Sequence, residues 1–480
     1  MKYPYRYLAR IIIEANTPIA VGSGEESVIT DRLIATDVNG FPYIPGTSLA
    51  GILRHSLTTD KNNKQIDDIF GCQGKEDGTG SRLILSSAMI LNNNGKVIDG
   101  LYDKDPSSDE FLKHFFDLPV RQHVRINHKG ASEKGNKFDE QVVFKGTRFC
   151  FEMELIGEPG DKEAWESIIS SFSDPDFRIG GGTRRGFGEI KVKECRTEII
   201  DLNKQLPRYL SKSSFLTDES RWWKNVTTKT EIRESIWEKY ELKLKPENFL
   251  MFGSGFGTDE ADMSYITESI IEWKDNNAEF GKRKLLIPAA SVKGTIAHRT
   301  AYYFNKINKI YADKISSDDI GLLIEKGYRI PESCKTYDSK KKDDIIKMIL
   351  EGNPAVRNLF GYTDDNKEGK AHRGNVLLSD MFIEDEGKKL FNHVSIDRFT
   401  GGAINGALFG EDVAKSTDTL TLCLFVNPIA FNREDVRESF EKTLIDICNG
   451  MLPLGGGTMR GHGCFKGILY KNGKEISHGE

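Results

Sequence analysis

Two glycine-rich segments carry residue types that are suited to binding phosphate. Residues 179–188 read IGGGTRRGFG, and residues 454–463 read LGGGTMRGHG. Glycines allow backbone N–H groups to approach a phosphate, and a guanidinium adds a charge-assisted hydrogen bond. Neither segment is a Walker A motif, because no Lys-Ser/Thr pair follows the last glycine. A tight hairpin would explain one such segment, whereas two copies favour a ligand loop, with candidate side chains Arg184, Arg185, Arg460 and His462.

These loops are the last of four sequence blocks that occur twice in the same order. The first block reads YIPGTSLAGILR at 43–54 and LIPAASVKGTIAHR at 286–299. The other pairs are 69–87 with 359–380, 123–128 with 393–398, and 179–188 with 454–463. Four matching blocks in one order indicate a tandem duplication.

The hydrophobic pattern indicates the elements that must position these loops. Residues 5–14 and 148–156 alternate apolar and polar side chains as strands do, whereas 47–57 and 161–172 have helical spacing. The second half repeats the later part of this pattern at 419–426 and 434–450. We therefore predict strand, helix, strand, strand, helix, strand in each half. This order is typical of an α+β fold of the ferredoxin-like, RNA-recognition type.

The length of 480 residues is too great for one ordinary domain. The duplication predicts two modules, 1–200 and 240–480, with a linker at 201–239 and an insertion at 305–350 in the second module. The formal net charge of −5 argues against a uniformly basic nucleic-acid coat, but it allows local basic surfaces.

The sequence also indicates where in the cell the protein is expected. No apolar run approaches the roughly 18 residues that span a membrane, so we expect no membrane contact. The apolar stretch at 11–13 is too short for the core of a signal peptide. Seven scattered cysteines without a CxxC pair read as free thiols of a cytoplasmic protein and argue against structural zinc.

The duplicated blocks resemble the RAMP superfamily of CRISPR-associated proteins. The similarity rests on the glycine loops, the IPG-type blocks and the two strands that end the 69–87 and 359–380 blocks. Within the superfamily, the chain is similar to backbone subunits of type III effector complexes, and its two fused modules resemble type III-D-like systems. The resemblance implies tandem ferredoxin-like modules with inserted thumb hairpins. It also implies a guide RNA, a complementary target RNA, other RAMP subunits and a large polymerase/cyclase-like subunit as partners.

The resemblance further implies which residues bind RNA. In the family the IPG block begins a helix whose N-terminus holds guide-RNA phosphates, which agrees with the anion preference of helix N-termini. The second half departs from the pattern at Ala289 and Ala290, which replace glycine and threonine. The matching helix positions are Gly46, Ser48, Gly51, Arg54, Ser291, Lys293, Gly294 and Arg299. The thumbs would contribute His123, Arg125, His393 and Arg398.

Target-RNA cleavage in the family depends on an aspartate ahead of the IPG block. Here DRLIATDVNGFPYIPG matches the family pattern and puts Asp31 in the catalytic position. A carboxylate beside a scissile phosphate can hold a divalent cation, for which we expect Mg²⁺ or Mn²⁺, or orient the attacking ribose hydroxyl. The structural alternative is a loop aspartate that accepts local N–H groups.

The catalytic position of the second half is less defined. An alignment of TESIIEW with TDRLIAT puts Glu268 opposite Asp31. The longer loop ahead of it also carries acidic residues, among which Asp262 is the other candidate. Glutamate is longer by one methylene, and catalytic geometry is sensitive to about an ångström.

Three other functions remain open from the sequence. The chain could be a non-catalytic RNA-binding scaffold, or a guide-precursor endoribonuclease that uses His55, His298 or His462. It could also be a phosphate-loop enzyme for a small nucleotide, although duplicated thumbs would serve no purpose there. A target-RNA endoribonuclease with Asp31 as its essential residue accounts for most of the motifs.

Overall fold

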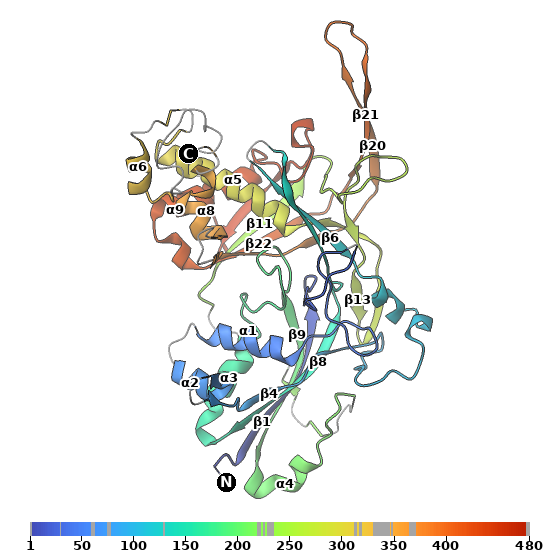
Figure 1. Cartoon of the computed structure of the whole chain (residues 1–480), viewed down its shortest axis with the longest axis vertical. Helices are drawn as coiled ribbons and strands as arrows, with labels where there is room; N and C mark the ends of the chain where they lie inside the picture. The colour runs from blue at the N-terminus through green and yellow to red at the C-terminus, as the bar shows by residue number, and fades with distance from the viewer. Residues whose placement is uncertain are drawn as a thin grey trace.

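Figure 1 shows the chain as a computed structural model. It describes residues 2–28, 30–58, 63–73, 78–127, 130–217, 222–223, 226–227, 235–311, 314–315, 319–329, 346, 349–363 and 371–476. Parts of the predicted linker at 201–239 and of the predicted insertion at 305–350 lie outside these residues.

The first half is built on an antiparallel sheet with the strand order β10-β9-β1-β8-β4. Its central strands are β1 (Tyr5–Ala15) and β8 (Arg148–Gly157), flanked by β9 (Ile190–Asp201) and β4 (Leu83–Leu85). Side chains of β1 alternate between the sheet faces, so one set joins a buried core with α1 (Gly46–Thr58) and α3 (Lys162–Ser171). Smaller elements are α2 (Asn63–Phe70), β2 (Cys72–Gln73), β3 (Gly78–Thr79), β5 (Met89–Ile90) and β10 (Val226–Thr227).

The second half has an antiparallel sheet with the order β18-β22-β11-β23-β24. Helices α5 (Ala289–Ile307) and α9 (Glu434–Cys448) share its core. The strands are β11 (Glu238–Pro246), β18 (Val376–Leu378), β22 (Leu420–Val426), β23 (Phe465–Lys471) and β24 (Lys474–Glu475). Further elements are β12 (Thr267–Glu268), β15 (Lys284–Ile287), α6 (Asp319–Glu325), α8 (Pro354–Phe360), β16 (Gly361–Thr363), β17 (Ala371–Arg373) and β19 (Met381–Ile383).

The two halves place corresponding strands in the same order. The path β9-β1-β8-β4 in the first sheet matches β23-β11-β22-β18 in the second, and helices α1 and α3 match α5 and α9. This mixed α+β architecture with antiparallel sheets is compatible with the predicted ferredoxin-like modules.

Each half also carries a long antiparallel hairpin at the predicted thumb. The first thumb consists of β6 (Val120–Ile126) and β7 (Ser132–Gln141), and the second consists of β20 (Lys388–Ile396) and β21 (Ala403–Ala414). Figure 1 shows β6 reaching from the first half towards α5, whereas β20 and β21 extend away from the body of the molecule.

The segment after β9 covers the face of the first sheet that lies opposite α1 and α3. Helix α4 (Leu202–Leu210) begins directly after that strand. Trp223 packs with Leu8 and Ile200 in a small buried cluster, and Trp222 lies against it. The tryptophan pair at 222–223 therefore anchors this part of the linker to the first half.

A hairpin from the second half completes the core of the first half. Strands β13 (Ile271–Lys274) and β14 (Asn277–Phe280) form this hairpin. Ile271 is buried in the first core, and the Phe280 ring lies 5.0 Å from that of Phe144. The Trp273 indole donates a hydrogen bond to the Gly146 carbonyl at 2.8 Å. The two halves are thus interlocked rather than merely joined by a linker.

Two further features of the described residues concern the helices and the cysteines. None of the described helices combines the length and apolar character that crossing a membrane requires. The described cysteines are all free thiols, and four of them (Cys150, Cys195, Cys423 and Cys448) have a pKa raised by burial. They are Cys72, Cys150, Cys195, Cys423, Cys448 and Cys464.

We predict that Ile271→Ala lowers the free energy of unfolding by about 2–5 kcal/mol, because it empties a buried site in the first core. Urea denaturation followed by circular dichroism measures the change. The matched control is Ile429→Ala, whose side chain is 72% exposed and should matter by less than about 0.5 kcal/mol. Equal effects of the two substitutions would show that the β13–β14 hairpin does not belong to the core.

Candidate nucleic-acid interface

The loop that carries Asp31 is attached to the base of the first thumb. The Asp139 backbone N–H donates to Asp31 Oδ2 at 3.0 Å, and the Asp31 N–H donates to Asp139 Oδ1 at 2.8 Å. The Gln141 N–H donates to the Arg32 carbonyl at 3.0 Å. Asp31 is exposed, so its carboxylate is held in a defined position and still faces solvent.

The second half repeats this attachment around Asp262. The Gly410 N–H donates to Asp262 Oδ2 at 2.8 Å, and the Asp412 N–H donates to the Met263 carbonyl at 2.8 Å. Gly410 is the counterpart of Asp139, because each follows the phenylalanine that stacks on the thumb histidine. Asp262 is also exposed. The hydrogen bonds therefore make Asp262 the structural counterpart of Asp31.

Glu268 occupies a different environment, so its alignment with Asp31 is wrong. Its side chain is buried, and its Oε2 accepts a hydrogen bond from Arg121 Nη2 at 2.8 Å. Burial raises the pKa of Glu268, and Arg121 opposes that shift. When both halves are counted from the thumb attachment, so that Asp262 corresponds to Asp31, Glu268 corresponds to Asp37. Asp37 is a turn residue whose carboxylate accepts the N–H groups of Asn39 and Phe41.

A short sequence signal could have identified Asp262. A Gly-Ser-Gly motif occurs at 22–24 and again at 253–255, and an aspartate follows seven residues after its last glycine in both halves. The backbone confirms this register, because the Ala35 N–H donates to Val21 O and the Ile266 N–H donates to Phe252 O. The alignment of TESIIEW with TDRLIAT instead pairs a threonine-acid step that lies six residues beyond Asp262.

A buried glutamate ties each thumb to its glycine loop. In the first half, Glu140 Oε1 lies 2.9 Å from His123 Nε2 and 2.7 Å from Arg185 Nη2. In the second half, Glu411 Oε1 lies 2.9 Å from His393 Nε2, 2.9 Å from Arg460 Nε and 3.2 Å from His462 Nε2. The predicted site residues do not include these glutamates, although the motif F-x-E-x-V at 138–142 recurs at 409–413. These histidines and arginines therefore have intramolecular partners.

The glycines of the loops are explained largely by close backbone packing. The Gly181 N–H donates to Ala20 O, and the Gly456 N–H donates to Met251 O, both at 2.6 Å. A side chain on Gly188 would overlap the Ile179 carbonyl, and its φ of +80° is strained for other residues. The loops are thus tight hairpins, and part of their N–H groups are used internally.

The first glycine loop also reaches the start of α5. Arg184 Nε donates to the Gly374 carbonyl at 2.8 Å, and burial lowers its pKa to about 10. On α5, burial lowers the pKa of Lys293 to about 8, and the nearby charges of Arg184 and Arg185 lower it further. Three cationic side chains therefore converge where the first loop meets α5.

Two exposed helix stripes carry the remaining candidates. Ser48, Gly51 and His55 follow one face of α1, and they line a cavity of about 440 Å³ together with Gly180 and Thr183 of the glycine loop. Ser291, Gly294 and His298 occupy the same positions on α5 and are all exposed.

Gly51 and Gly294 have no packing reason to be glycine. No heavy atom lies within 4 Å of the position that a Cβ would take at either residue. Glycine inside a helix costs roughly 0.5–1 kcal/mol relative to alanine. Both halves therefore leave the helix backbone open at this position, and packing does not explain why.

Other predicted positions on these helices serve the packing of each half. Arg54 Nη2 pairs with Asp67 of α2 at 2.6 Å, and Arg299 pairs with Asp446 of α9 at 2.6 Å. A Cβ on Gly46 would lie 2.6 Å from the Leu85 carbonyl, so close contact with β4 requires glycine there.

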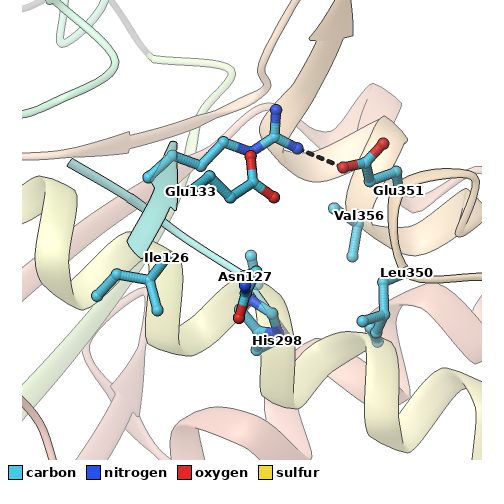
Figure 2. Close-up of a pocket in the computed structure, with 10 residues that line it drawn as sticks. Ile126, Asn127, Glu133, His298, Leu350, Glu351 and Val356 are labelled. Atoms are coloured by element: carbon cyan, nitrogen blue, oxygen red, sulfur yellow. Dashed lines mark hydrogen bonds and ion pairs between the residues drawn. The ribbon is translucent and has the colours of Figure 1, made fainter. Parts of the chain in front are cut away.

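The first thumb ends against the second half. Arg125 Nη2 lies 2.5 Å from Glu351 Oε1, and it closes one side of a cavity of about 170 Å³ beside His298. Figure 2 shows Leu350, Glu351 and Val356 together on one side of this cavity. The second thumb has no such seat within the described part of the chain: Arg398 at its tip is exposed, and Phe399 is 99% exposed.

The residues present suit a divalent cation only as partial ligands. Among the described residues, no three histidine, cysteine, aspartate or glutamate side chains are grouped so that they could hold a metal ion. Asp31 and Asp262 each offer an exposed carboxylate, and beside Asp31 lies the half-buried carboxylate of Asp139, which already accepts N–H groups of Asp31 and Gln122. Such a donor set fits Mg²⁺, which keeps several waters and takes further oxygen ligands from a bound phosphate.

We predict that Glu411→Gln destabilises the protein in a pH-dependent way. Burial would raise the pKa of Glu411, but Arg460, His393 and His462 outweigh it and lower the pKa. The charge therefore contributes stability above the unfolded glutamate pKa of about 4.3, and this contribution is lost as the pH falls through the folded pKa. Unfolding in urea should show a loss of about 3 kcal/mol at pH 7.

The same unfolding series below pH 4 should show the wild type and Glu411→Gln converging. Glu163→Gln, at an exposed position on α3, is the control and should leave the curve unchanged. A difference between wild type and Glu411→Gln that stays constant over the whole pH range would contradict the assigned ion cluster.

Comparison with known families supports the resemblance that the motifs indicated. The family model described as the RAMP superfamily matches residues 12–191 and 243–466, one region in each half. No match was found among the curated proteins with which the chain was compared. The matched regions include both Gly-Ser-Gly loops, both thumbs and both glycine loops, and they cover well over half of the chain. The chain is therefore a member of the RAMP superfamily.

Proposed function

We propose that the chain is a double-module backbone subunit of a type III CRISPR ribonucleoprotein that binds guide RNA and cleaves complementary target RNA. Family membership suggests a CRISPR-associated RNA-binding subunit, since RAMP proteins bind RNA and other subunits in CRISPR complexes. Each half is a ferredoxin-like RAMP module, with boundaries at 1–200 and 240–480 around a 201–239 linker. The fused type III-D-like arrangement, the large polymerase/cyclase-like subunit and a cytoplasmic location belong to the same proposal.

Guide RNA binds along the exposed stripes of α1 and α5. Its phosphates approach the backbone at Gly51 and Gly294, where the open surface would admit them. At the start of α5 the favourable charge comes from Lys293, because Arg184 and Arg185 beside it already pair with Asp176 and Glu140. Most other predicted basic residues hold intramolecular ion pairs. They therefore contribute more to the fold of each half than to the charge of the surface that would face the RNA.

The observation that carries the cleavage proposal is the duplicated attachment of Asp31 and Asp262. Two exposed carboxylates accept the same thumb N–H group in the two halves. An exposed charge that is held by the backbone is preorganised for an incoming group rather than for packing. We propose Asp31 and Asp262, and not the buried Glu268, as the catalytic residues.

In this proposal the chain's own contribution is to hold the carboxylate and the RNA in register. The thumb N–H of Asp139 or Gly410 fixes one carboxylate oxygen, which leaves the other oxygen to orient a ribose 2′-hydroxyl. A bound Mg²⁺ or Mn²⁺ would supply charge stabilisation at the scissile phosphate. For the guide-precursor alternative, His462 is buried against Glu411, which leaves His55 and His298 as its candidates.

We predict that Gly51→Ala raises the free energy of unfolding by about 0.5–1 kcal/mol and weakens guide-RNA binding several-fold. The methyl group fits the helix but occupies the space where a phosphate would approach. Urea unfolding and fluorescence anisotropy with guide RNA measure the two effects. Gly321→Ala, at an equally open helical position in α6, should stabilise the protein without weakening RNA binding. If Gly51→Ala bound guide RNA with unchanged affinity, α1 would not contact the RNA.

We predict that Asp31→Ala and Asp262→Ala each abolish a different cut in a labelled complementary RNA. The loss should reach about two orders of magnitude for the affected cut, since the essential carboxylate is removed. The measurement uses the assembled complex with guide RNA, in Mg²⁺ and again in EDTA, which should stop both cuts.

Asp259→Ala provides the matched control, because it removes an exposed carboxylate from the same loop as Asp262. It should leave both cuts intact. Full cutting by the Asp31→Ala, Asp262→Ala double variant would reject the endonuclease proposal and favour an RNA-binding scaffold. Cutting that persists in EDTA would reject the metal.

A further inference from the structure

A large cavity lies between the base of the first thumb and the loop that leads to Asp262. Its volume is about 800 Å³. The first half contributes Pro119 and Val120, and the second half contributes Phe256, Thr258 and Asp412 among other residues. The cavity therefore exists only because the two halves are packed together.

Phe256 presents an aromatic ring at this cavity. Its side chain is 61% exposed, although the loop that carries it is held firmly. Ser254 Oγ accepts the Phe256 N–H at 3.1 Å, and the Ser254 and Ser264 hydroxyls donate to the Phe256 carbonyl at 2.8 and 2.9 Å. The Lys137 ammonium of the first thumb lies 5.8 Å from the ring centroid. An exposed aromatic ring on a loop held by hydrogen bonds, with a cation nearby, offers a stacking platform suited to a nucleobase.

Asp412 supplies an unused hydrogen-bond acceptor in the same cavity. Its side chain is 2% exposed, and its Oδ2 accepts from Lys388 Nζ at 3.1 Å. Its Oδ1 is buried and has no hydrogen-bond partner within the described part of the chain. Leaving a buried carboxylate oxygen unpaired is costly, so a ligand N–H group would fit there.

The first half lacks both features at the matching positions. The Gly-Ser-Gly register puts Glu25 where the second half has Phe256, and the thumb register puts Gln141 where it has Asp412. A carboxylate in place of the ring removes the stacking surface. The arrangement therefore distinguishes the Asp262 loop from the Asp31 loop.

We propose that this cavity binds an unpaired nucleobase that carries an amino group, from the RNA strand that passes Asp262. The base stacks on Phe256, and its amino group donates a hydrogen bond to Asp412 Oδ1. Adenine, cytosine and guanine provide such a donor on an exocyclic amine, whereas uracil does not. The inference rests on the proposed RNA-binding function and adds a base preference at the Asp262 loop.

The test measures the full-length chain with fluorescent single-stranded oligo-A, oligo-C and oligo-U. The wild type should bind oligo-A and oligo-C more tightly than oligo-U, and Phe256→Ala should weaken oligo-A binding by about five- to tenfold, as expected for the loss of one base stack. Asp412→Asn should remove the preference over oligo-U. Phe215→Ala is the control, because Phe215 is 60% exposed on a different surface and should change nothing.

A second measurement is independent of affinity. RNA that contains 2-aminopurine should lose fluorescence on binding the wild type, through stacking, and lose less on binding Phe256→Ala or Phe256→Leu; Phe256→Trp should restore the quenching. Equal quenching by wild type and Phe256→Ala, or the same base preference in Asp412→Asn, would overturn the inference while RNA binding itself persists. A wild type that binds none of the oligonucleotides would instead reject the proposed function.

Discussion

The buried ion cluster around Arg121 decides how the two halves of the chain meet. Arg121, at the base of the first thumb, contacts Glu268 and lies 3.2 Å from Asp380, both in the second half. Asp380 Oδ1 also accepts the N–H of Ala289, the first residue of α5. All three charged side chains are buried, so removing one would leave an uncompensated charge at a cost of about 3–5 kcal/mol.

This cluster sits beside the contact between the first glycine loop and α5. The Asp380 N–H donates to the Gly186 carbonyl, and a Cβ on Gly186 would collide with Ala289. Asp380 stands where the first half has Ser87, so the charge that joins the halves arose at a position where the duplicated sequences differ. The cavity beside the Asp262 loop, the contact of Arg125 with Glu351 and the cations at the start of α5 all lie where the two halves meet.

The duplication left two similar sites in unequal surroundings. Both exposed aspartates accept a hydrogen bond from a thumb strand, and a buried glutamate connects each thumb to a glycine loop. The first thumb is seated against the second half, whereas the second thumb extends from the body with apolar side chains exposed (Figure 1). Asp139 of the thumb and Glu25 of the loop accompany Asp31, whereas Gly410 of the thumb and Phe256 of the loop accompany Asp262. We therefore expect the two sites to treat an RNA strand differently.

The sequence by itself determined the superfamily, the duplication and the order of strands and helices, because these depend on local periodicity and contiguous motifs. It also offered Asp31 as the candidate carboxylate of the first half. The choice between Glu268 and Asp262 came from backbone hydrogen bonds to the thumb. The repeated Gly-Ser-Gly motif points the same way, although the more obvious match of Thr267-Glu268 to Thr30-Asp31 points elsewhere. The sequence could not reveal that Arg185 and Arg460 hold buried glutamates more than forty residues away. Tertiary structure decided those roles, because ion pairs and cavities join residues that are distant along the chain and leave no trace in local spacing.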